Sequence, residues 1–161
     1  MGKILCSTRG GEASIRTQEE AIRRAKETSD ELIFFYVTDV EFLAFANYAL
    51  HSDLVVSEMD RMAEFLMTMA VERAEKAGVA ATYLIRHGDF VEELRRTIEE
   101  EGITLVILGQ PSEEEGAFRL AELRALAQRI HKETGVAVWI PGLDEDAEDK
   151  PPTEHEDQEP L

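Results

Sequence analysis

The chain has 161 residues, and 43% of them are hydrophobic, which is enough for the buried core of one domain. Its 34 acidic and 17 basic residues give a net charge of −17, which argues against nonspecific binding to nucleic acids or anionic membranes, because both are polyanions. The one cysteine, Cys6, cannot form an intramolecular disulfide, and no run of 18 apolar residues predicts a membrane span. We therefore expect a soluble protein of a reducing cytoplasm.

Short apolar runs alternate with helical segments along the chain. Strands are predicted at 4–7, 32–37, 81–85, 103–108 and 136–140. Helices are predicted between Gly11 and Ser29, from about Ser57 to Gly78, from Asp89 to Glu101, and from about Gly116 to Glu133. Residues 39–54 are apolar without a clean period, and we expect a loop with one helical turn there.

The order β-α-β-α-β-α-β-α-β predicts an α/β fold. We expect an open five-stranded parallel sheet with helices on both faces, which is a Rossmann-like domain that covers residues 1–142. Residues 143–161 hold nine acidic residues and one lysine with almost no apolar side chain, so they are predicted to form a disordered acidic tail.

Ligands of such sheets bind beyond the carboxyl ends of the strands, where the winding order switches. Those ends are residues 7–12, 37–39, 87–89 and 109–114. Arg9 lies there, and it suits either a ligand anion or an ion pair with a nearby carboxylate. His87 is interpreted as a polar loop residue, because no nucleophile or second histidine accompanies it in the sequence.

Four segments in this order resemble the universal stress protein family. They are Lys3-Ile4-Leu5, Phe35–Asp39, Gly88-Asp89 with Glu92-Glu93, and Leu105–Gly109. The resemblance covers residues 3 to about 141. It implies a UspA-like domain whose architecture is related to that of the adenine-nucleotide alpha-hydrolases.

The resemblance also implies where a nucleotide-binding member would hold its ligand. Such a member has an aspartate near the end of its first strand, backbone at the end of its second strand for the adenine, and a Gly-x2-Gly-x9-Gly-Ser/Thr phosphate loop after its fourth strand. Glycines let backbone N–H groups approach phosphate oxygens. Here Arg9 replaces the aspartate, Val37 is compatible with the adenine contact, Gly109 matches the first glycine, and Ser112 replaces the second.

The last glycine and hydroxyl positions of that loop fall on Glu122 and Leu123. A carboxylate there repels phosphate, and Glu113–Glu115 add like charge. The resemblance therefore implies the branch of the family that does not bind ATP, in which ATP and AMP are disfavoured and no cofactor is expected. The tentative ligand cleft consists of Arg9, Val37, Gly109 and Ser112.

No enzyme motif is present, since the chain lacks Gly-x-Ser-x-Gly, His-Glu-x-x-His, a Walker loop and Cys-x-x-Cys, and no metal site is expected. The preferred hypothesis is a non-enzymatic, cytoplasmic regulatory or stress-response module that acts through a protein partner or an unidentified small ligand. The alternative is an adenine-nucleotide-binding switch with a degenerate phosphate loop, in which Arg9 contacts a phosphate. A third hypothesis is a small-ligand enzyme on the same architecture.

The family resemblance further implies a homodimer through the last strand. That interface would use Val136, Val138, Trp139 and Ile140. Burial of Trp139 against the sheet is equally compatible with the sequence. The aromatic residues Phe42, Phe45 and Tyr48 suit a plug for the cleft, a cover for the dimer edge or a ligand wall. Core packing is the simpler explanation for the methionines at 59, 62, 67 and 69, and a pliable binding surface is the alternative.

Overall fold

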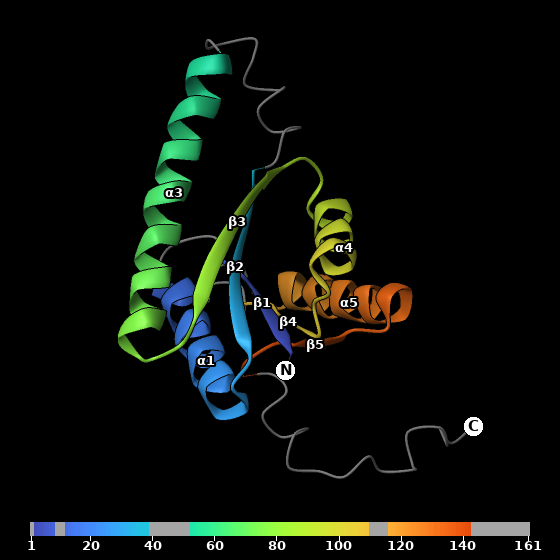
Figure 1. Ribbon diagram of the computed structural model, residues 1–161. Coiled ribbons are helices and arrows are strands. Elements are labelled where there is room, and N and C mark those ends of the chain that lie inside the picture. The colour runs from blue at the N-terminus through green and yellow to red at the C-terminus, as the bar shows by residue number, and fades with distance from the viewer. Residues whose placement is uncertain (1, 9–11, 39–51, 110–115, 143–161) are drawn as a thin grey trace, which may run out of the picture.

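The computed structural model describes residues 2–8, 12–38, 52–109 and 116–142 (Figure 1). Its strands are β1 (Lys3–Ser7), β2 (Glu31–Thr38), β3 (Ala81–His87), β4 (Leu105–Ile107) and β5 (Ala137–Trp139). Its helices are α1 (Glu12–Thr28), α3 (Ser52–Lys76), α4 (Phe90–Glu101) and α5 (Gly116–Thr134). None of the helices in this described part is long and apolar enough to cross a membrane.

All five strands lie in one parallel sheet with the order β3-β2-β1-β4-β5. Helices α1 and α3 cover one face of this sheet, and α4 and α5 cover the other (Figure 1). The chain starts in the middle at β1, winds outward to β3, and then returns to β4 on the other side. This topology confirms the predicted fold class, and it places the switch in winding order between β1 and β4.

The core consists of two clusters, one on each face of the sheet. Leu32 and Phe34 of β2 belong to the cluster under α1 and α3, whereas Ile33 and Phe35 belong to the cluster under α4 and α5. Successive side chains of a strand point to opposite faces, so a strand that is buried on both sides needs a continuous apolar run. That requirement explains why 32–37 is predicted so clearly from the sequence.

Helix α4 is delimited by local backbone chemistry. A side-chain oxygen of Asp89 accepts a hydrogen bond from the backbone N–H of Glu92 at 3.1 Å, which confirms the predicted start of this helix. At the other end, Gly102 adopts φ 66°, a left-handed conformation in which glycine has no Cβ to clash. These two ends fix the position of α4 over the sheet.

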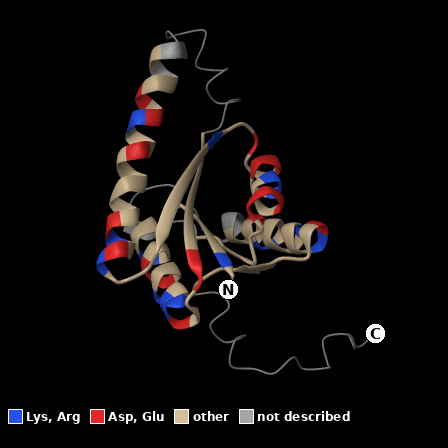
Figure 2. Cartoon of the chain, viewed as in Figure 1, with Lys and Arg blue, Asp and Glu red and all other residues tan. Residues whose placement is uncertain are grey.

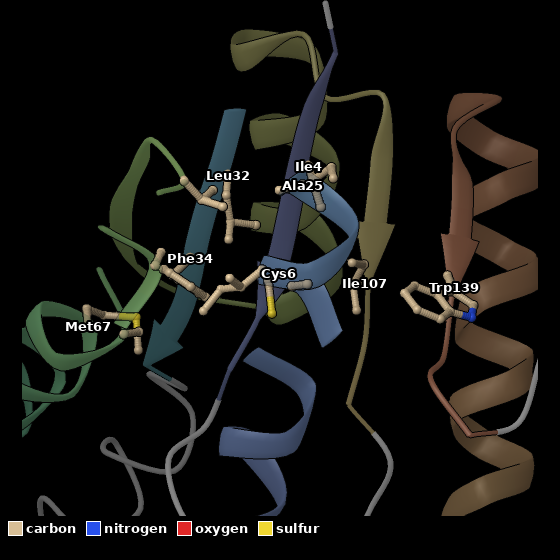
Figure 3. Packing of buried hydrophobic residues seen from close by; sticks show 13 residues of the cluster. Ile4, Cys6, Ala25, Leu32, Phe34, Met67, Ile107 and Trp139 are labelled. Carbon is tan, nitrogen blue, oxygen red and sulfur yellow. The ribbon is translucent and has the colours of Figure 1, made fainter. Parts of the chain in front are cut away.

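Two expectations about α3 are wrong. The helix begins at Ser52 and not near Ser57, so part of the segment predicted as a loop is helical. Of the methionines assigned to the core, Met67 is buried against the sheet (Figure 3), but Met62 is 66% exposed and Met69 is 43% exposed. Apolar side chains on the outward face of α3 hide the helical period, which is why the start of this helix is hard to predict from the sequence.

Trp139 faces the core of its own chain. It is 6% exposed, it lies beside Ile107 in the cluster shown in Figure 3, and the Arg24 guanidinium stands 5.5 Å from its ring centroid. Ile140 is also buried. Of the two expectations for Trp139, burial against the sheet is therefore the one that the structure supports.

Cys6 gives a prediction about pH. It is completely buried on β1, and burial raises the pKa of its thiol from 9.0 to about 12. Above pH 9 the unfolded chain loses this proton before the native chain does, so the free energy of unfolding falls by about 1.4 kcal/mol per pH unit up to pH 12. Urea denaturation of the parent chain and of Cys6→Ala at several alkaline pH values isolates this effect. Equal slopes for both chains would contradict it.

Candidate functional site

The carboxyl ends of β1, β2 and β4 meet at one edge of the sheet. The backbone N–H of Thr8 donates to the carbonyl of Phe35 at 3.0 Å, so β1 and β2 stay paired to the end of β1. Val37 and Gly109 follow on opposite sides of β1, because β1 lies between β2 and β4. Two strand spacings of about 4.8 Å each separate their backbones. Arg9, Ser112, Phe42, Phe45, Tyr48 and Glu113–Glu115 lie outside the described residues.

Val37 does not point its side chain into this edge. The side chain packs against the cluster under α4 and α5, and the residue pairs with Arg86 of β3. The role that the sequence suggests for Val37 therefore falls to its backbone. Any apolar residue that fits the cluster would serve equally well there.

Gly109 owes its identity to packing against α1. A Cβ added at Gly109 would lie 2.8 Å from the Thr17 hydroxyl oxygen and 3.5 Å from two Thr17 carbons. Thr17 is buried and β-branched, so its rotamers are restricted and its hydroxyl has little freedom to move away. The close approach of helix and strand explains this glycine without any phosphate.

A buried polar network, which the sequence did not single out, lies beside these residues. The Gln18 side-chain amide donates to the Thr8 hydroxyl at 2.8 Å, and the Arg73 guanidinium donates to the Gln18 side-chain carbonyl. Thr8 and Gln18 are both buried. The network thus joins the end of β1 to α1 and α3. One sequence pattern could have indicated this network: polar residues occur directly after an apolar strand and again in the first turns of the next helix.

Thr38 lies at the end of β2, at the same edge of the sheet. It is 1% exposed, and its hydroxyl has no hydrogen-bond partner within the part of the chain that the structure describes. By strand alternation it shares a sheet face with Phe34 and Tyr36. A buried hydroxyl without a partner costs about 1–3 kcal/mol, so a polar ligand atom at this edge would relieve a penalty.

His87 has a partner that its sequence neighbours do not reveal. Its Nε2 atom lies 2.7 Å from a carboxylate oxygen of Asp60, which ties the end of β3 to α3. Both side chains are partly exposed, and the contact joins two secondary-structure elements. Within the described ranges no group of three or more His, Cys, Asp or Glu side chains could hold a metal ion.

Glu122 and Leu123 lie inside a helix. They are the seventh and eighth residues of α5, so helical hydrogen bonds occupy their backbone N–H groups. Glu122 is exposed, and Leu123 packs against the core cluster under α4 and α5. The sequence predicts that charge keeps phosphate away from Glu122. That expectation stays a prediction.

Comparison with known proteins gives a consistent result. A scan against family models matches the universal stress protein family over residues 1–121, which is most of the chain. A search of curated proteins finds no match.

Solved structures share the fold at low sequence identity. A universal stress family protein from Burkholderia pseudomallei is 19% identical with a TM-score of 0.68, over 86% of this chain and 94% of that one. A universal stress protein in complex with cAMP is 15% identical with a TM-score of 0.61, over 86% and 94%. The universal stress protein from Archaeoglobus fulgidus in complex with dAMP is 10% identical with a TM-score of 0.57, over 87% and 96%.

The contact between Gly109 and Thr17 is testable by a double-mutant cycle. Gly109→Ala should lower the free energy of unfolding by about 1–3 kcal/mol, because the new methyl group overpacks the junction of β4 and α1. In a Thr17→Ala background the same substitution should cost clearly less, since the atom it meets is gone. Denaturant unfolding of the four chains measures both values. An equal cost in both backgrounds would show that another constraint holds Gly109.

Proposed function

The chain belongs to the universal stress protein family, and from this premise we propose that it is a regulatory or stress-response protein of the cytoplasm. It acts as a non-enzymatic, homodimeric binding module, and it does not use the ATP-binding loop of its nucleotide-binding relatives. Its partner is a protein or an unidentified small ligand at the carboxyl edge of the sheet, near Arg9, Val37, Gly109 and Ser112.

The position of Glu122 and Leu123 within α5 carries this proposal. A phosphate loop needs free backbone N–H groups, and the N–H groups of these two residues belong to helical hydrogen bonds. This observation favours a member of the family in which α5 occupies part of the segment that forms the loop in nucleotide-binding relatives.

Charge supports the same conclusion. Glu122 is exposed on α5, and a second negative charge at about 4 Å costs about 1 kcal/mol even in water. With an excess of 17 acidic over basic residues, the chain offers few cations to offset a triphosphate. A neutral or cationic ligand suits this edge better than a nucleotide.

The alternative is an adenine-nucleotide switch with a degenerate loop. Its support comes from the proteins of the same fold in complex with cAMP and dAMP. A monophosphate makes smaller demands on a phosphate loop than ATP does. Val37 would then offer its backbone to the base. The Thr38 hydroxyl, which has no hydrogen-bond partner among the described residues, lies at the same strand end.

Calorimetric titration with ATP and AMP separates the two functions. We expect no binding heat with the full chain or with a chain that ends at residue 142. Glu122→Gln serves as the matched variant, because it removes the carboxylate and leaves α5 intact. It should also give no binding heat, since the backbone N–H groups stay in the helix. Binding by the parent chain at micromolar concentration would contradict the proposal and support the nucleotide switch.

The homodimer is proposed to form along the free edge of β5. Trp139 and Ile140 are buried in their own chain, so the partner would contact backbone groups together with Val136 and Val138. The Trp139 carbonyl accepts a hydrogen bond at 3.0 Å from the backbone N–H of Leu108, the residue directly after β4. Backbone groups of successive strand residues point to opposite edges, so the N–H of Val138 faces away from β4.

Val138→Pro tests this interface. Proline removes one N–H from the free edge and none from the pairing with β4, so the fold should survive while strand pairing between copies is lost. We expect an assembly of lower mass than that of the parent chain by light scattering after size exclusion, with unchanged helix content by circular dichroism. Val138→Thr keeps the N–H and the β-branched shape, and it should keep the mass of the parent assembly. A Val138→Pro chain that forms an assembly of the parent mass would rule out this interface.

A further inference from the structure

The outward face of α3 is unusually apolar for an exposed surface. Among the residues that the structure describes, six large hydrophobic side chains are exposed, and four of them belong to α3: Leu54, Met62, Phe65 and Met69. Three of the four are at least 65% exposed. Single exposed apolar residues are ordinary, but a cluster on one helix marks an interaction surface.

These four side chains lie on one side of the helix. Met62, Phe65 and Met69 follow one another at intervals of three and four residues, and Leu54 lies eleven residues, or three turns, before Phe65. The opposite side of α3 packs on the sheet through Met67, Ala70 and Ala74 (Figure 3 labels Met67), and Ala63 on the same side is also buried. Helix α3 therefore has two apolar faces, and the described part of the chain covers only one of them.

Charged residues flank the exposed face in a definite order. Glu58 and Arg61 lie before its centre and Glu72 and Lys76 after it, and Figure 2 shows acidic, basic and uncharged residues interleaved along α3. Glu58 and Arg61 form an ion pair at 3.7 Å within their own helix, and both are at least 70% exposed. Glu72 and Lys76 are exposed as well, so all four charged side chains are accessible to a partner.

We propose that this face binds the same face of a second copy of the chain, with the two α3 helices antiparallel. If Phe65 of one copy packs on Met69 of the other, Glu58 comes opposite Lys76, and Arg61 comes close to Glu72. The twofold axis generates each of these pairs twice. Parallel helices would instead place each charge beside its own counterpart, so the charge pattern favours the antiparallel arrangement.

This surface is distinct from the β5 edge. Strand β5 lies at one end of the sheet, whereas α3 covers the part formed by β2 and β3 at the other end (Figure 1). The inference does not depend on the proposed function, and each contact can be disrupted while the other is kept. A chain that uses both contacts forms assemblies larger than a dimer.

Site-specific cross-linking tests both the contact and its direction. Cys6 is fully buried, so thiols introduced on the surface are the reactive ones. Full-length Glu58→Cys and Lys76→Cys chains are treated with a short bis-maleimide, each alone and as an equimolar mixture. In an antiparallel pair the two copies of position 58 lie about 27 Å apart, from about 18 residues at 1.5 Å each. We therefore expect cross-linked dimer from the mixture and none from either chain alone.

Two control variants distinguish the proposed contact from cross-links that form when chains collide at random. Glu64→Cys is also at an exposed position, but it lies one turn from buried Met67, outside the apolar face, and it should not cross-link with Lys76→Cys. Adding Phe65→Glu to both partners should lower the yield at least tenfold, and Phe65 is 65% exposed, so this change does not touch the core.

Each outcome decides the proposal. Cross-linking of Glu58→Cys or Lys76→Cys alone would overturn the antiparallel arrangement. No cross-link in the mixture, or a yield that Phe65→Glu leaves unchanged, would overturn the contact itself. Because the thiols are on α3, failure here leaves the β5 interface and the nucleotide question untouched.

Discussion

Strand β2 cannot expose either of its faces. Phe34 and Phe35 are neighbours in sequence, they point to opposite sides of the sheet, and both are completely buried. A strand of this kind is stable only when helices cover both sides, which requires crossover connections and a parallel sheet. The same requirement brings the carboxyl ends of the strands to one edge, where the sheet changes winding direction. The location of the candidate site is thus a consequence of how this strand is buried.

A phosphate loop and helix α5 would need the same backbone N–H groups, those of Glu122 and Leu123. An N–H that serves the helix at Glu122 is unavailable to an anion, and Leu123 contributes its side chain to the core. Both residues are therefore engaged within the fold of this chain, Glu122 through its backbone and Leu123 through its backbone and side chain. Gly109 fits this picture, because its contact with Thr17 would require glycine whether or not a ligand is bound.

The topology could be predicted well from the sequence, since each strand is an apolar run and each crossover helix has a turn or cap before it. Contacts that depend on distant parts of the chain could not. The hydrogen bonds from Arg73 to Gln18 and from Gln18 to Thr8 join three elements, and the contact of His87 with Asp60 spans 27 residues. For the methionines of α3, the sequence favours core packing over an exposed surface for a different reason. Met62 and Met67 look alike in a hydrophobic pattern, and only the direction of each side chain separates them.

The position of Trp139 gives this protein a natural optical probe. It is the only tryptophan of the chain. It lies on the edge strand β5, and the guanidinium of Arg24 from α1 lies over its ring. Its indole N–H has no hydrogen-bond partner among the described residues. The emission of such a buried ring depends on whether water and the nearby cation reach it. Intrinsic fluorescence therefore follows the docking of α1 on the last strand, separately from the helix content of the molecule.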